Sequence, residues 1–109
     1  MSTPNEVTAA EVEALMAGDD PPQLIDVREA PELQMDGWIK GARHMPMSAF
    51  QGREGEIDKT RPVVIHCAHG QRSWDVGCYL ISLGFENVSN MEGGIAAWGG
   101  PIERSAGGR

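Results

Sequence analysis

The 109-residue chain has few cysteines, few aromatic residues and no long apolar run. Its two cysteines, Cys67 and Cys78, form no Cys-x-x-Cys pair and no cluster with histidine at zinc-binding spacing, so neither a disulfide framework nor a structural metal site is indicated. We expect no metal and no cofactor. Since no stretch is long and apolar enough to span a bilayer and the N-terminus lacks a secretory pattern, we expect a cytoplasmic protein.

Basic residues are also scarce. The chain has 9 Lys and Arg against 16 Asp and Glu, a net charge of −7, and residues 1–36 hold nine of the acidic residues and only one basic residue, Arg28. Nucleic acids and anionic membranes are bound by clustered basic surfaces, so we expect neither as a partner. The acidic first third indicates a solvated acidic face.

The length and the 40% hydrophobic content predict a single domain with a packed core. We expect an N-terminal extension over residues 1–5, the domain over residues 6–102, and a loose tail over residues 103–109. The small, polar segment Ser105–Arg109 is typical of such a tail.

The first half of the chain alternates helix and strand signals. Thr8 and Glu11 have the spacing of a capping box and predict a helix over Ala9–Ala17 that ends before Gly18. The apolar run Gln23–Val27 predicts a buried strand. Pro31 suits the first turn of a second helix.

The strongest unit is a strand followed by a helix. Three consecutive β-branched residues predict a strand over Pro62–His66, and an apolar stripe predicts a helix over Ser73–Leu83, followed by Gly84. Weaker signals predict a strand over Ala42–Met45, a partly helical stretch over residues 51–61, a final strand over Asn87–Asn90 and a last helical turn at residues 93–98. This alternation predicts an α/β fold with a largely parallel sheet.

Cys67 lies where the strongest strand meets its helix. In α/β proteins, backbone N–H groups and the helix dipole converge at such a point, and both lower the pKa of a thiol. His66, His69 and Arg72 supply possible positive charge. Gly70 lets the backbone turn so that N–H groups can face an anion.

The loop Cys67-Ala68-His69-Gly70-Gln71-Arg72-Ser73 resembles the Cys-x-x-Gly-x-Arg-Ser active-site loop of rhodanese-like sulfurtransferases. Further segments match the family in order: Leu24–Arg28, Gly37–Ala42, Glu92–Gly94 and Ala97-Trp98. The resemblance covers roughly Glu6 to Ile102, the length of the single-domain bacterial members. It implies a small central, mostly parallel sheet of about five strands with helices on both faces.

The resemblance also implies a sulfurtransferase. Cys67 would take the outer sulfur of thiosulfate or of a persulfide and pass it to cyanide or a thiol, with a sulfur-acceptor protein as a possible partner. A thiolate attacking a polarised sulfur needs a low pKa and a good leaving group but no general base.

Roles for the other loop residues follow from the same resemblance. The substrate-binding residues would be Ala68, His69, Gly70, Gln71, Arg72 and Ser73. The planar fork of Arg72 suits sulfonate oxygens, and Ser73 either donates to the Cys67 sulfur or caps the helix, of which we favour capping. Asp26 and Arg28 would support the site as an ion pair, and Cys78 would be an inert core thiol.

The chain departs from the family pattern at three residues. Trp38 replaces the usual histidine, and Trp74 and Asp75 stand where small residues are common. Trp74 would shape the pocket beside the loop. Asp75 lies three residues after Arg72, a spacing at which the two side chains can pair and weaken oxyanion binding.

Other functions remain open at this stage. Phosphatases and arsenate reductases of the same fold are one alternative, but the phosphatases use Cys-x5-Arg, whereas Cys67 and Arg72 have the shorter Cys-x4-Arg spacing. The second is a relay module that receives a persulfide from another protein without using thiosulfate. The third, a purely structural domain, would usually lack the nucleophile.

Overall fold

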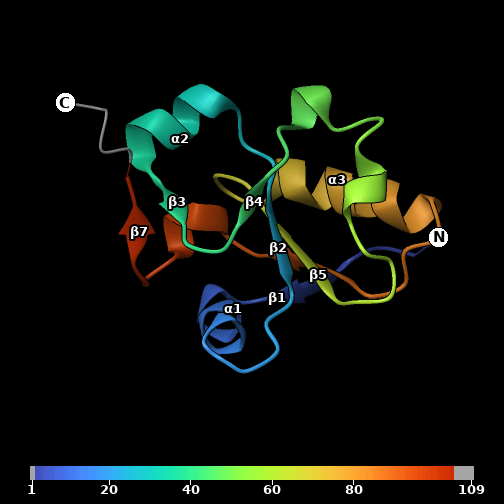
Figure 1. The fold of residues 1–109 in the computed structure, drawn as a ribbon, viewed down its shortest axis with the longest axis horizontal. Coiled ribbons are helices and arrows are strands. Elements are labelled where there is room, and N and C mark those ends of the chain that lie inside the picture. The colour runs from blue at the N-terminus through green and yellow to red at the C-terminus, as the bar shows by residue number, and fades with distance from the viewer. Residues whose placement is uncertain (1, 105–109) are drawn as a thin grey trace.

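The computed structural model describes residues 2–104 and shows an α/β fold (Figure 1). The sheet has the strand order β1 (Asn5–Val7), β6 (Val88–Met91), β5 (Val63–His66), β2 (Gln23–Asp26) and β4 (Arg43–His44), and all four neighbouring pairs are parallel. The predicted five-stranded, mostly parallel sheet is confirmed. The predicted tail segment Ser105–Arg109 lies outside the described residues.

Helices cover both faces of this sheet, because its buried strands carry apolar side chains on each side. On one face, α1 (Ala9–Met16) packs its Val12 against Leu24 and Val64. On the other, α3 (Gln71–Ser82) buries Val76 and Leu80 with strand residues of β2 and β5. Figure 1 shows α1 below the sheet, with α3 and α2 (Ala30–Asp36) above it.

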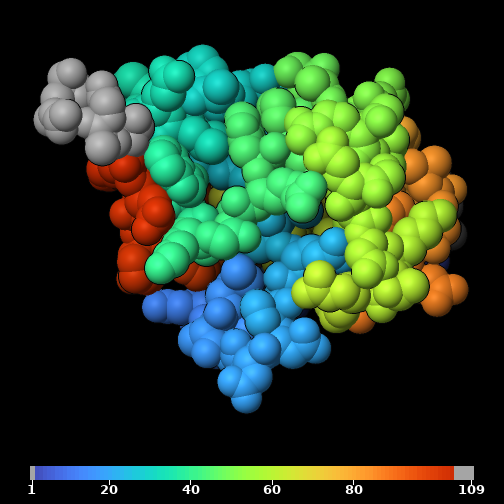
Figure 2. Space-filling model, in the orientation of Figure 1, coloured from blue at the N-terminus to red at the C-terminus, as the bar shows by residue number. Residues whose placement is uncertain are grey.

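Several local predictions agree with the structure. Thr8 and Glu11 form both hydrogen bonds of the capping box at the start of α1, and Pro31 stands in the first turn of α2. The residue range 51–61 contains only the 3-10 turn η2 (Glu54–Glu56), next to η1 (Met47–Ala49). Figure 2 shows that the residues between β4 and β5 form much of one face of the molecule.

Three short strands were not predicted. The first is β1, which begins at Asn5. The other two, β3 (Trp38–Ile39) and β7 (Ile102–Glu103), pair in a small antiparallel sheet. We had expected β6 to be the last strand, but β7 follows it. The turn η3 (Gly94–Ala97) follows β6. Among residues 2–104, no helix has the length and apolar character needed to cross a membrane.

Candidate active site

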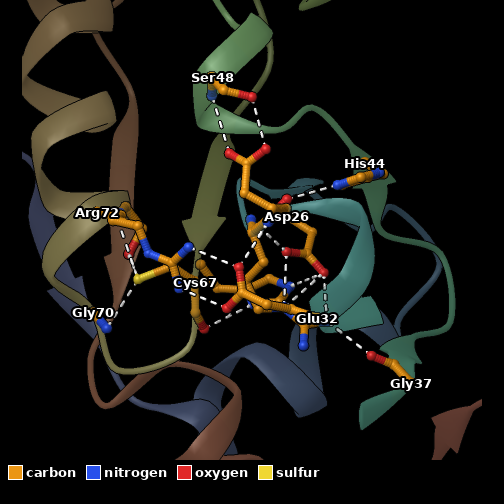
Figure 3. Close-up of polar contacts among 12 residues, drawn as sticks. Asp26, Glu32, Gly37, His44, Ser48, Cys67, Gly70 and Arg72 are labelled. Atoms are coloured by element: carbon orange, nitrogen blue, oxygen red, sulfur yellow. Dashed lines mark hydrogen bonds and ion pairs between the residues drawn. The ribbon is translucent and has the colours of Figure 1, made fainter. Parts of the chain in front are cut away.

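Cys67 directly follows β5 and lies under the first turn of α3. Gly70 is the capping residue just before that helix and has a φ of +107°, a left-handed conformation that favours glycine. The Cys67 sulfur accepts hydrogen bonds from the N–H groups of Gly70 at 3.0 Å and Ser73 at 3.4 Å (Figure 3). The loop therefore directs backbone donors at the sulfur of Cys67, a residue that is only 1% exposed.

We had expected Ser73 to cap α3, but it does not. Gly70 holds the capping position, and Ser73 lies inside α3 with a buried hydroxyl. Its Oγ lies 3.3 Å from the sulfur of Cys67 and donates to Oδ1 of Asn90 at 2.5 Å. The serine thus contacts the candidate nucleophile through both its backbone and its side chain.

The pKa of the Cys67 thiol lies below its ordinary value. Burial is the largest single influence and raises the pKa, but the Ser73 hydroxyl and the backbone N–H groups of Ser73, Gly70 and His69 together lower it by more. These donors stabilise the thiolate because they are fixed in the fold before the charge forms. The lowered pKa increases the fraction of Cys67 that is present as the thiolate.

Arg72 pairs with Glu32 and not with Asp75, although the spacing within α3 allows the second pair. Both terminal nitrogens of Arg72 donate to the Glu32 carboxylate at 2.8 Å (Figure 3). This hydrogen bonding by Arg72 lowers the pKa of Glu32 to about 2, and Glu32 in turn raises the pKa of Arg72. Asp75 instead accepts a weak hydrogen bond from Gln71 at 3.5 Å.

A buried polar group lies behind the loop. Arg28 donates to both oxygens of Asp26, its Nη2 at 2.8 Å, and also to the carbonyl of Gly37, so the expected ion pair is present. His66 is fully buried, and burial is the main reason that its pKa is lowered, although Asp26 acts in the opposite direction. His66 is therefore neutral near pH 7 and supplies no positive charge to Cys67.

The remaining predicted residues lie around the outside of the loop. His69 and Gln71 are exposed, and His69 and Ala68 line a hollow of about 270 Å³ beside η3. Trp74 is half-buried on the first turn of α3. Cys78 is half-buried as well, so it is not the core thiol that we expected.

A second loop holds the Cys67 loop in place. Ile95 N–H donates to the carbonyl of Cys67 at 2.8 Å, and Ala96 N–H donates to the carbonyl of Ala68 at 3.2 Å. Gly94 permits this approach, because a Cβ atom there would lie 2.4–2.5 Å from the backbone of Ala68 and Cys67. The segment that contains Gly93 and Gly94 therefore forms one wall of the site.

Sequence reasoning did not identify Glu32 or Asn90. Glu32 lies 40 residues from Arg72 along the chain and Asn90 lies 17 from Ser73, so only the folded sheet and helices bring them together. No local spacing marks either contact. Asn90 lies in a segment that was predicted as a strand, but nothing in the local sequence indicates that its side chain contacts Ser73.

Comparison with known proteins adds an independent observation. Residues 8–100 match the family model described as "Rhodanese-like domain". The chain is 36% identical to a sulfurtransferase of Allochromatium vinosum over 94 residues, which is 86% of this chain and 87% of that protein. It is 33% identical to the thiosulfate sulfurtransferase GlpE of Shewanella oneidensis, over 70% of this chain and 74% of that one.

A solved structure is similar over nearly the whole chain. The crystal structure of a rhodanese-like domain protein from Staphylococcus aureus superposes with a TM-score of 0.86 at 32% identity, covering 94% of this chain and 99% of that one. The similarity therefore includes the sheet, the flanking helices and the loops that join them.

Proposed function

The chain belongs to the rhodanese-like family, whose members include sulfurtransferases, and from this premise we propose that it transfers a sulfane sulfur through a persulfide on Cys67. The observation that carries the proposal is the set of donors around the Cys67 sulfur. The N–H groups of Gly70 and Ser73 lie 3.0 and 3.4 Å from it. They favour the thiolate, which is the reactive form in sulfur exchange.

The first half-reaction needs no general base. The Cys67 thiolate attacks the outer sulfur of thiosulfate, a new S–S bond forms, the bond to the sulfonate sulfur breaks, and sulfite leaves with that electron pair. Cys67 is left as a persulfide. The N–H groups of Gly70 and Ser73 are placed to stabilise negative charge at this position before and after the transfer.

The second half-reaction returns the enzyme to its starting state. Cyanide or a thiolate attacks the outer sulfur of the persulfide, that sulfur leaves with its new partner, and the electron pair of the broken S–S bond stays on Cys67 as the thiolate. The donors that lower the pKa of Cys67 also make it a better leaving group here. A sulfur-acceptor protein can take the place of the small thiol.

We assign Arg72 to the sulfonate oxygens of the donor, with the loop backbone from Ala68 to Ser73 around the reacting sulfur. His69 and Gln71 are at the open side of this loop, and Trp74 borders it on α3. Asp26 and Arg28 support the chain behind the site. The proposed compartment is the cytoplasm, because the reaction needs Cys67 as a reduced thiol and reducing compartments maintain it.

A second candidate function is a relay that takes sulfur from a protein persulfide. The pairing of Arg72 with Glu32 favours it, because both forked donors of the arginine are occupied by a carboxylate. Thiosulfate must displace Glu32 to use them, whereas a persulfide donor without a sulfonate does not. Rates with thiosulfate and with a small-molecule persulfide distinguish the two donors.

The test of the proposed function is thiocyanate formation from thiosulfate and cyanide. Cys67→Ser should lose this activity completely, because serine cannot form a persulfide. Cys78→Ser is the matched control and should retain it. Activity that survives Cys67→Ser, or that is lost only with Cys78→Ser, would overturn the assignment.

A further inference from the structure

Asn90, on strand β6, is linked to Cys67 through Ser73. The Ser73 hydroxyl donates to Oδ1 of Asn90 at 2.5 Å and lies 3.3 Å from the Cys67 sulfur. Asn90 is 2% exposed and Ser73 is fully buried, so water does not replace these contacts. The three residues form one buried chain of hydrogen bonds.

The orientation of the Asn90 amide is fixed at its other end. Its Nδ2 donates to Oε1 of Glu6 on β1 at 3.0 Å and to the carbonyl of Gly70 at 3.2 Å. A carboxylate and a carbonyl only accept hydrogen bonds at neutral pH, so the amide nitrogen must face them. The amide oxygen is therefore turned toward Ser73.

Ser73 has a single hydroxyl proton and two groups that can accept it. When Cys67 is a thiol, its S–H donates to Ser73 Oγ and the Ser73 hydroxyl donates to Asn90, so every group is satisfied. When Cys67 is a thiolate, the sulfur needs the same proton. Either the sulfur keeps only its backbone donors, Gly70 and Ser73 N–H, or the Asn90 oxygen lacks its donor, and this competition offsets part of the stabilisation of the thiolate by the backbone.

We propose that Asn90 is a positioning residue that draws the Ser73 hydroxyl proton away from Cys67 and so limits how readily the thiol ionises. Glu6 is the anchor that holds Asn90 in this orientation. The inference rests on the proposed role of Cys67 as nucleophile. Its consequence is chemical, because a thiolate whose pKa is not lowered too far is the stronger nucleophile once it forms.

Other charged groups surround Cys67 and act on its ionisation too. On the open side are His69 and the Arg72–Glu32 pair. His66 at the end of β5 lies beside Asp26 and Arg28 at the end of β2, and Glu6 ends the hydrogen-bond chain. Substitutions of Asn90 and Ser73 keep the charges of these groups in place, but Asn90→Leu also removes the hydrogen bonds to Glu6 and to the Gly70 carbonyl. The effect of the shared proton is therefore the part of the shift that depends on the Ser73 hydroxyl.

The experiment is a titration of the Cys67 thiolate by its ultraviolet absorbance, in Cys78→Ser protein, with the Cys67→Ser, Cys78→Ser protein as the baseline. Asn90→Leu removes the competing acceptor at similar volume, so the midpoint should fall by about one pH unit, the worth of one hydrogen bond to a charged group. Asn90→Asp accepts the proton more strongly and adds a negative charge, so the midpoint should rise. The added charge of Asn90→Asp raises the midpoint whatever the role of Asn90, so the fall in Asn90→Leu is the diagnostic shift.

Two further comparisons keep the proposal falsifiable. In a Ser73→Ala background, Asn90→Leu should no longer shift the midpoint, because no hydroxyl remains to be released. If Asn90→Leu does not fold, as judged by circular dichroism, Glu6 tests the same chain from its exposed end. Glu6→Leu should lower the midpoint more than Glu6→Gln, which keeps an acceptor oxygen for Asn90.

An unchanged midpoint in folded Asn90→Leu would overturn the proposal, as would a shift that persists without the Ser73 hydroxyl. Equal shifts for the two Glu6 variants would also overturn it. No sulfur donor enters the titration, so its result is independent of whether the protein transfers sulfur.

Discussion

Arg72 donates one hydrogen bond of 2.8 Å from each terminal nitrogen to the carboxylate of Glu32. The pair joins the first turn of α3 to the first turn of α2 beside Cys67 (Figure 3). Both side chains are about one third exposed, so an anion can compete for the arginine. The cation assigned to the substrate is thus already bound to an anion of the protein.

Glu32→Gln should therefore improve thiosulfate binding. The neutral amide competes less well for Arg72, and loss of a pair worth about 1 kcal/mol corresponds to a fall in KM of about fivefold. Initial rates of thiocyanate formation over a range of thiosulfate concentrations measure this. Asp75→Asn is the matched control, since Asp75 lies on the same helix but contacts Gln71, and its KM should stay unchanged. An unchanged or higher KM in Glu32→Gln would contradict this role.

The same pair predicts a pH dependence of stability. The pKa of Glu32 is lowered from 4.5 to about 2 by Arg72, so the stabilisation is present above pH 4.5 and is lost as the pH falls toward 2. Because the pair is partly exposed, we expect only about 1 kcal/mol. Urea unfolding of the wild type and of Glu32→Gln at pH 6 and at pH 2.5 measures this stabilisation. Taking the difference between the two proteins removes the pH dependence that other groups, such as His66, contribute to both. If the difference in free energy of unfolding between the two proteins were no smaller at pH 2.5 than at pH 6, the pair would not be the source of the stabilisation.

Gly94→Ala should disturb the Cys67 loop. The added Cβ would meet the backbone of Cys67 and Ala68, and the φ of +62° already disfavours a side chain. We expect a loss of about 2 kcal/mol in the free energy of unfolding, together with most of the activity. Gly99→Ala is the control, because nothing lies within 4 Å of its Cβ position, and its stability should stay close to that of the wild type.

The sequence predicted the fold well where periodic apolar signals were strong. The β-branched run of β5, the apolar stripe of α3 and the capping box of Thr8 and Glu11 each depend on neighbours along the chain, and these elements appear as expected. The strands β3 and β7 have two residues each. Too few residues alternate in such strands to give a signal, and pairing across the fold determines them.

The candidate site was predictable only in part for the same reason. The position of Cys67 between strand and helix could be read from one continuous segment. The partners Glu32 and Asn90 could not, because topology brings them to Arg72 and Ser73 from distant elements. The helix itself begins two residues earlier than predicted, at Gln71, which moves Ser73 from the expected cap into the first turn.

The central claim is that Cys67 carries the transferred sulfur, and intact-mass analysis after incubation with thiosulfate tests it most directly. We expect the protein to gain the mass of one sulfur atom, located by peptide mapping on the peptide that contains Cys67. The gain should persist in Cys78→Ser and vanish in Cys67→Ser, and cyanide should remove it. Absence of the sulfur from Cys67 with both thiosulfate and a small-molecule persulfide, or its appearance on Cys78, would contradict the account.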